Sequence, residues 1–163
     1  MTTLVVAGSV TEYVADYVAG YDTSWTTNTS VTLAAGHGGF IRKYIPGAAL
    51  DALHDGCEIT NIRVEFTASY SGGVYVTPSA FAYFPYGVLG GVQIVDVALT
   101  TSPSIYAANG GAGLAPSVVR AAYMYSSCLN RDDFYSVGVS MSNPLITITY
   151  IDNGLPSMMQ FSL

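Results

Sequence analysis

Charged side chains are scarce in this sequence. Only 10% of its 163 residues are Asp, Glu, Lys or Arg, against roughly 25% in a typical soluble domain. Basic residues are the rarest, with five Lys and Arg against eleven Asp and Glu, which gives a net charge of −6. Of the basic residues only Arg42 and Lys43 are adjacent. Nucleic-acid binding needs a basic patch, so we expect no nucleic-acid partner.

Long hydrophobic runs are also missing. The longest apolar stretch near the start, "LVVAG", is too short for the apolar core of a secretion signal and has no basic flank. No stretch approaches the roughly 20 apolar residues of a membrane span. We therefore expect neither standard export nor a membrane anchor.

Cysteine and histidine are too few for a convincing metal site. Cys57 and Cys128 are the only cysteines, and His37 and His54 are the only histidines. A structural zinc site needs four such ligands at regular spacings, and these four are irregularly spaced. We expect no metal or other cofactor and two free, partly buried thiols, with a single disulfide as the alternative.

What the sequence does contain is the pattern of β-strands. Apolar and polar residues alternate over short runs that are separated by Gly, Pro, Asn and Asp, and no amphipathic helix of ten residues is present. The pattern predicts a single all-β domain over 1–163, a two-sheet antiparallel β-sandwich of jelly-roll type. The predicted strands are 2–7, 11–19, 29–34, 38–45, 58–70, 73–84, 91–98, 134–142 and 144–152, and a tight turn at 152–154 is expected to fold the tail back as a last short strand.

Three segments interrupt the strand pattern. The segment 46–56 has Leu50 and Leu53 three residues apart and predicts a short helical turn near 48–54. The segment 100–117 is rich in Gly, Ala, Ser and Pro and predicts a long surface loop. The segment 118–134 predicts a strand followed by a turn.

Acidic residues gather at two places. Asp132–Asp133 is the only adjacent acidic pair, and its setting favours a solvated turn or cap over a catalytic pair. Asp51, His54, Asp55 and Glu58 form the densest polar cluster of the sequence. We favour a helical turn facing water there, with a metal or acid–base cluster as the alternative.

Motifs for nucleophilic catalysis and phosphate binding are absent. No serine stands in G-x-S-x-G between a strand and a long helix, and "GGAG" lacks the Lys and Ser/Thr of a phosphate loop. His37 lies in "AAGHGGF" and is interpreted as a turn residue. We therefore predict that the protein is not an enzyme.

The aromatic residues give the clearest functional signal. In "VYVTPSAFAYFPY" (74–86) both faces of the predicted strand are apolar or aromatic, so both need to be covered. One cover is the partner sheet, and the other is a sister subunit, a loop of the same chain or a stacked sugar ring. The candidate interface residues are Tyr75, Phe81, Tyr83, Tyr86, Tyr106, Tyr123 and Tyr125.

Two stretches resemble β-sandwich modules of bacteriophage virions. "GFIRKYIPGAALDALHDGCEITNIRVEFTASYSGG" is similar to a recurring "G-F-x…I-P-x-G" approach to an I-T-x-I-x-V-x-F/I strand. "LNRDDFYSVGVSMSNPLITITYI" is similar to the closing strands of such modules. The matching pieces, which cover about half the chain, are 39–41, 45–47, 59–66, 134–139 and 146–150. The resemblance implies a jelly-roll-like capsid or tail accessory protein, commonly a symmetric oligomer; the Gly/Ala-rich segment and the Tyr-rich middle depart from it.

The leading hypothesis is a non-enzymatic virion structural protein. It would be a capsid decoration or head-associated protein, assembled in the host cytoplasm, that binds the major capsid protein and its sister subunits, with a trimer favoured. Few charges and a mean hydropathy of +0.39 favour such association. The alternative is a glycan-binding or host-receptor-binding β-sandwich of a phage tail, in which exposed Tyr side chains or Trp25 stack on sugar rings.

Overall fold

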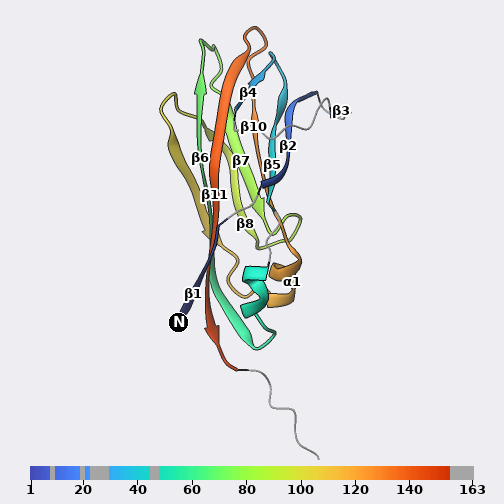
Figure 1. Ribbon diagram of the computed structural model, residues 1–163. Helices are drawn as coiled ribbons and strands as arrows, with labels where there is room; N and C mark the ends of the chain where they lie inside the picture. The colour runs from blue at the N-terminus through green and yellow to red at the C-terminus, as the bar shows by residue number, and fades with distance from the viewer. Residues whose placement is uncertain (8–9, 19–20, 23–29, 45–47, 155–163) are drawn as a thin grey trace, which may run out of the picture.

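The computed structural model describes residues 1–7, 10–18, 21–22, 30–44 and 48–154 (Figure 1). Within them the chain forms eleven strands, one 3-10 helix (η1, Ala48–Ala52) and one α-helix (α1, Pro116–Ala121). None of the described helices is long and apolar enough to cross a membrane. The strands form two antiparallel sheets, so the predicted sandwich and the helical turn near 48–54 are confirmed. Trp25 and the tail after 154 lie outside the described residues.

The first sheet, sheet A, is centred on two long neighbouring strands. These are β6 (Cys57–Ser71) and β11 (Val137–Asp152), which pair along most of their length. The other strands of sheet A are β1 (Thr2–Ala7) and β4 (Ser30–Leu33), both beside β11, and β9 (Ser104–Gly110), beside β6.

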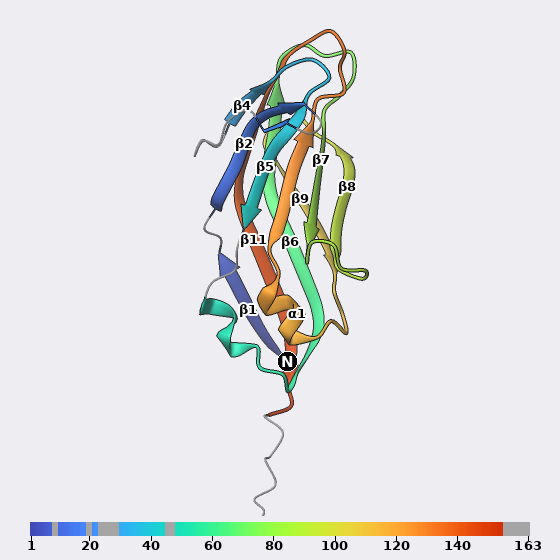
Figure 2. The ribbon, with the colours of Figure 1, turned by 90° about the vertical axis from the view of Figure 1, so that its right-hand side faces the viewer.

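The second sheet, sheet B, packs against sheet A. Its strands, in spatial order, are β3 (Tyr21–Asp22), β2 (Val10–Val18), β5 (Gly38–Tyr44), β10 (Met124–Leu129), β7 (Ser79–Phe84) and β8 (Val92–Ala98). Figures 1 and 2 place η1 and α1 at one end of the sandwich and the loops 72–78 and 130–136 at the opposite end.

The core lies between the two sheets and follows from the alternation of β6. Ile62, Val64 and Phe66 are at most 1% exposed, and each contributes about 1.5–3 kcal/mol by burial. Arg63 and Glu65 point the other way and form an ion pair at 2.8 Å on the outer face. The two-faced pattern of this strand is therefore confirmed.

The two late strands predicted at 134–142 and 144–152 are one strand, β11. Its pairing with β6 shifts between Ser142 and Leu145, and Asn143 has a φ of 53°. This is a β-bulge, which absorbs Pro144 without ending the strand. The prediction of two separate strands was therefore wrong, because β11 pairs with β6 on both sides of the bulge.

The predicted long loop at 100–117 is wrong. Residues 104–110 form β9, which pairs with β6, and 116–121 form α1. Small residues with low strand propensity adopt the strand here because β6 offers a row of backbone partners. Tyr106 anchors the strand, since its ring stacks on Phe66 at 5.8 Å between centroids.

Two further segments differ from their predictions. The strand predicted at 73–84 begins only at Ser79. The segment 118–134 begins inside α1 rather than as a strand, and β10 follows at 124–129. Pro116 occupies the first turn of α1, where its fixed φ and missing N–H are tolerated.

Candidate functional site

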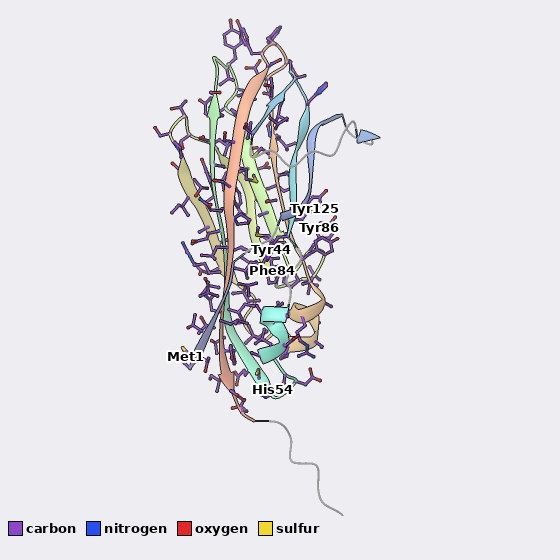
Figure 3. All side chains as sticks on the ribbon, in the orientation of Figure 1. Met1, Tyr44, His54, Phe84, Tyr86 and Tyr125 are labelled. Carbon is purple, nitrogen blue, oxygen red and sulfur yellow. The ribbon has the colours of Figure 1, made fainter. Side chains whose placement is uncertain are left out.

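A cluster of aromatic side chains, the tyrosine platform, covers part of the outer face of sheet B. Its members are Phe81 and Tyr83 on β7, Tyr86 after β7, Tyr123 before β10 and Tyr125 on β10. Figure 3 shows Tyr86 and Tyr125 together at one side of the sandwich, with Tyr44 and Phe84 inside it. Tyr86 is the most exposed member, at 52%, and the other four rings are partly buried.

The platform rings form one continuous set of contacts. Ring centroids are 6.0 Å apart for Phe81 and Tyr83, and 6.1 Å apart for Tyr83 and Tyr86. Tyr86 lies 5.4 Å from Tyr125 and 5.8 Å from Tyr123, the latter with only 21° between ring planes. Contacts of this kind contribute about 0.5–1.5 kcal/mol each beyond their buried area. The surface is therefore built in advance of any ligand.

Strand alternation places these rings outside. On β10 the side chains of Met124 and Cys128 are fully buried in the core. Tyr125, between them in the sequence, therefore faces outward. On β7 Ala82 and Phe84 are buried in the same way, and Tyr83 faces outward directly opposite Tyr125.

A hollow of about 250 Å³ adjoins the platform. The turn after β7 forms one wall, closed by hydrogen bonds from Val88 N–H to the Pro85 carbonyl and from Gly91 N–H to the Val88 carbonyl. The residues lining the hollow are Tyr83, Tyr86, Gly87, Val88, Leu89 and Gln93. None of them is charged, so the hollow offers apolar surface and uncharged hydrogen-bonding groups.

The strand register extends the platform into a row across sheet B. Tyr125 is opposite Tyr83, and Tyr83 is opposite Gln93. Residues directly opposite one another in a sheet are neighbours on the same face. The row thus continues the aromatic pair with the polar side chain of Gln93 on β8.

The structure separates the predicted interface residues into three groups, which are the platform residues, Tyr75 and the buried Tyr106. Phe81, Tyr83, Tyr86, Tyr123 and Tyr125 are together in the platform. Tyr75 lies near one end of the sandwich, in contact with Phe134 and Tyr135.

Tyr106 was wrongly predicted as an interface residue. It is only 6% exposed, and its hydroxyl accepts from Thr100 N–H at 2.9 Å and donates to the Ala98 carbonyl at 3.3 Å. Gln93 and Leu89 were missed. Alternation in the predicted strand 91–98 places Gln93 on the opposite face from Val92 and Ile94. Only the register between β7 and β8 puts Gln93 beside Tyr83.

The polar segment 51–58 does not form a single site. Asp55 pairs with Arg120 at 2.6 Å, and His54 hydrogen-bonds to Asp152 at 3.0 Å. The two remaining acids of the segment are exposed. His54 is thus a partly buried contact to the end of β11, which corrects the prediction that it faces water.

His54, Cys57 and Asp152 bring their potential ligand atoms within 4.8 Å of one another. Gly56 N–H donates to His54 Nδ1 at 3.1 Å, so the proton of a neutral ring is on Nε2, which faces Asp152 Oδ1. A metal ion would need the lone pair of that nitrogen. The arrangement fits a hydrogen bond that fastens the turn before β6 to the end of β11.

Asp132 is a structural carboxylate. It is buried, and it accepts backbone N–H groups from Tyr75, Val76, Phe134 and Tyr135 at 2.5, 3.1, 2.8 and 3.0 Å. Burial by itself would raise the pKa of Asp132, but these hydrogen bonds hold it below its ordinary value. Its oxygens are occupied, so Asp132 acts as a cap, as predicted for the acidic pair, although it is buried rather than solvated; Asp133 is exposed.

Both thiols are free and buried, which confirms the prediction. Cys57 and Cys128 belong to different parts of the core. Burial raises the pKa of Cys128, so its thiol is protonated at neutral pH and is a poor nucleophile.

Comparison with known proteins gives similarity of fold only. No protein-family model and no curated protein matches the chain. A solved structure described as "CBM4 structure and function" is 18% identical with a TM-score of 0.47, covering 90% of this chain and 95% of the other. The N-terminal cellulose-binding domain of a Cellulomonas fimi β-1,4-glucanase C, solved by NMR, is 17% identical with a TM-score of 0.37, covering 93% and 90%. At such low identity and TM-score neither structure assigns a ligand to this chain.

Proposed function

We propose that this protein is a non-catalytic carbohydrate-binding β-sandwich that binds a neutral glycan on the tyrosine platform. The observation that carries the proposal is the continuous cluster of Tyr83, Tyr86, Tyr123 and Tyr125 beside an uncharged hollow. This is the recognition role that the sequence offered as its alternative, without the phage tail.

Tyrosine suits a sugar because both have an apolar face and polar edges. The C–H groups on one face of a pyranose pack against an aromatic ring, while the phenol hydroxyl remains available at the rim. Tyr86, half exposed and contacting two other tyrosines, is the central stacking residue. The continuous contacts from Phe81 to Tyr123 provide room for more than one sugar ring.

Gln93 supplies the polar contact that fixes orientation. It is exposed, lines the hollow and lies opposite Tyr83. Its amide both donates and accepts hydrogen bonds, so it can pair with sugar hydroxyls, which also do both. The absence of charge among the residues lining this hollow favours a neutral glycan over an acidic one.

The test is affinity gel electrophoresis against a panel of neutral soluble polysaccharides, followed by calorimetry with any that retards the protein. We expect the wild type to bind one, and Tyr86→Ala and Tyr123→Ala each to weaken binding at least tenfold, about 1.4 kcal/mol. Gln93→Ala should weaken it less. The matched control is Tyr75→Ala, which removes a tyrosine that is 75% exposed in the loop between β6 and β7 and whose ring contacts are with Phe134 and Tyr135, outside the platform.

The proposal fails if no neutral polysaccharide binds, or if Tyr75→Ala weakens binding as much as Tyr86→Ala does. Because the platform residues lie on the outer face, we expect each variant to fold, and circular dichroism of each variant checks that the sandwich is intact.

A second candidate function, subunit association in a larger assembly, rests on a different surface. Val95 and Val97 on β8 are 52% and 40% exposed, and Ile105 on β9 is 66% exposed. Within the described residues β8 and β9 each lie at one edge of their sheet, and edge strands with exposed apolar side chains promote association. A virion location and a capsid partner remain predictions, because neither the fold nor the similar structures support them.

A further inference from the structure

Three exposed aromatic side chains gather at the end of the sandwich opposite η1 and α1. Tyr75 comes from the loop between β6 and β7, and Phe134 and Tyr135 come from the loop between β10 and β11. Both loops lie at the same end in Figures 1 and 2. The side chains are 75%, 78% and 44% exposed. We call this group the tip cage.

The rings of the tip cage are steeply tilted to one another. Tyr75 and Phe134 have ring centroids 6.1 Å apart and planes at 88°, and Tyr75 and Tyr135 have centroids 5.2 Å apart and planes at 59°. In the tyrosine platform, by contrast, Tyr86 and Tyr123 are nearly parallel, at 21°. Tilted rings present their faces in different directions, so a compact group can contact more than one ring, whereas parallel rings suit a flat ligand.

One buried carboxylate organises the tip cage. Asp132 accepts the backbone N–H groups of all three cage residues, at 2.5 Å from Tyr75, 2.8 Å from Phe134 and 3.0 Å from Tyr135. Buried Asn130 fixes the same loop, because its side chain donates to the Tyr135 carbonyl at 2.9 Å and accepts from Asp132 N–H at 3.1 Å. The backbone segments that carry the three rings are therefore held in position before any ligand arrives.

The electrostatic environment of the tip cage is negative. Asp132 carries its charge directly beneath the three residues, and exposed Asp133 adds a second carboxylate. The neighbouring cation, Arg131, is engaged with Asp96 of β8 at 2.5 Å. The whole chain has a net charge of −6. Aromatic faces and a negative field together select a cation.

We propose that the tip cage of Tyr75, Phe134 and Tyr135 binds a methylated ammonium group of the choline type. Such a cation is bulky and weakly hydrated, so its methyl groups pack against tilted rings while its charge is attracted by the ring faces and by the carboxylates below. An ordinary ammonium ion would lose more hydration on entering. The site is separate from the tyrosine platform and does not depend on glycan binding.

The test uses the full chain and choline chloride, with chemical shifts followed by NMR at low and constant ionic strength. The matched ligand control is 3,3-dimethylbutan-1-ol, which has the shape of choline without its charge. We expect saturable binding of choline and at least tenfold weaker binding of the neutral alcohol. Phe134→Ala and Tyr75→Ala should each weaken choline binding about tenfold, and Tyr75→Phe should retain most of it.

The matched protein control is Tyr86→Ala, which removes a platform tyrosine and should leave choline affinity within twofold of wild type. The proposal is overturned if choline does not bind, if the neutral alcohol binds equally well, or if Tyr86→Ala weakens binding as much as Phe134→Ala does. Loss of glycan binding in Tyr86→Ala with choline binding intact separates the two proposals.

A second arm identifies the source of the group once choline binds. Sedimentation with phosphatidylcholine vesicles that requires Phe134 supports a lipid headgroup as the natural ligand. Choline binding without sedimentation supports a soluble methylated amine.

Discussion

Asp132 connects two loops that are far apart in the sequence. It joins 75–76 to 134–135 through four backbone N–H groups. In Asp132→Asn one acceptor oxygen becomes an NH₂ group that faces N–H donors, so two of these bonds are replaced by repulsion. We expect a clearly lower melting temperature at pH 7, measured by circular dichroism.

The effect of Asp132 depends on pH with a definite sign. The pKa of the folded-state carboxyl lies below its ordinary value, so its stabilisation is complete above the unfolded-state pKa of about 3.9 and disappears as pH falls through the folded-state pKa. The difference in melting temperature between wild type and Asp132→Asn should therefore narrow as the pH is lowered below about 4. Asp133→Asn, the exposed neighbour, is the control and should show little difference at pH 7. A difference that is constant down to pH 2 would contradict this account.

Among single residues, sequence reasoning identified the type better than the place. Tyr83 and Tyr86 were proposed as interface candidates because both faces of the predicted strand 74–86 are apolar or aromatic and both need a cover. Tyr106 was misassigned because its segment did not look like a strand, so its inward orientation was not predictable. Gln93 acquired its importance only from the register of β8 against β7.

The turn after β9 contains two glycines with similar backbone conformations but different surroundings. Gly111 and Gly113 have φ values of +73° and +78°. A Cβ on Gly111 would lie 2.8 Å from Ile62 Cδ1, whereas a Cβ on Gly113 would meet nothing within 4 Å. Ala at either position costs about 1–2 kcal/mol of backbone strain, and Gly111→Ala adds about 1–3 kcal/mol of overpacking.

Urea unfolding of Gly111→Ala and Gly113→Ala measures this difference. We expect both variants to be less stable than wild type, and Gly111→Ala to lose the more stability. Equal losses would mean that the core around Ile62 relaxes freely, which would contradict the close packing of β9 on β6.

At the scale of elements, regular strands were predictable and exceptions were not. The strands 2–7, 38–45, 58–70 and 91–98 were placed within two residues because their alternation is uninterrupted. β9 was missed because Ala, Asn, Ser and Gly form a strand only when a neighbour offers its backbone. β11 was divided in two because Pro144 hides a bulge.

On the scale of the whole molecule, three exposed apolar side chains lie on β8 and β9, which are edge strands. If the exposed Val95, Val97 and Ile105 mediate association, native mass spectrometry at micromolar concentration should detect oligomers, with a trimer the state favoured by the sequence. Val97→Lys should raise the dissociation constant at least tenfold, since a charge on an edge strand opposes pairing. Val5→Lys, the same change at a side chain 55% exposed on β1, should have little effect. A monomeric wild type would contradict the prediction.

By itself the sequence determined the class of the fold, the scarcity of basic residues and the high tyrosine content. These depend on composition and on local periodicity, which are properties of neighbouring residues along the chain. Only the tertiary structure decided which aromatic residues act together. Tyr83 and Tyr125 meet through the pairing of β7 with β10, and Tyr75 meets Phe134 through Asp132. Contacts between distant segments depend on strand register and loop closure, and these are set by the packing of the whole sandwich.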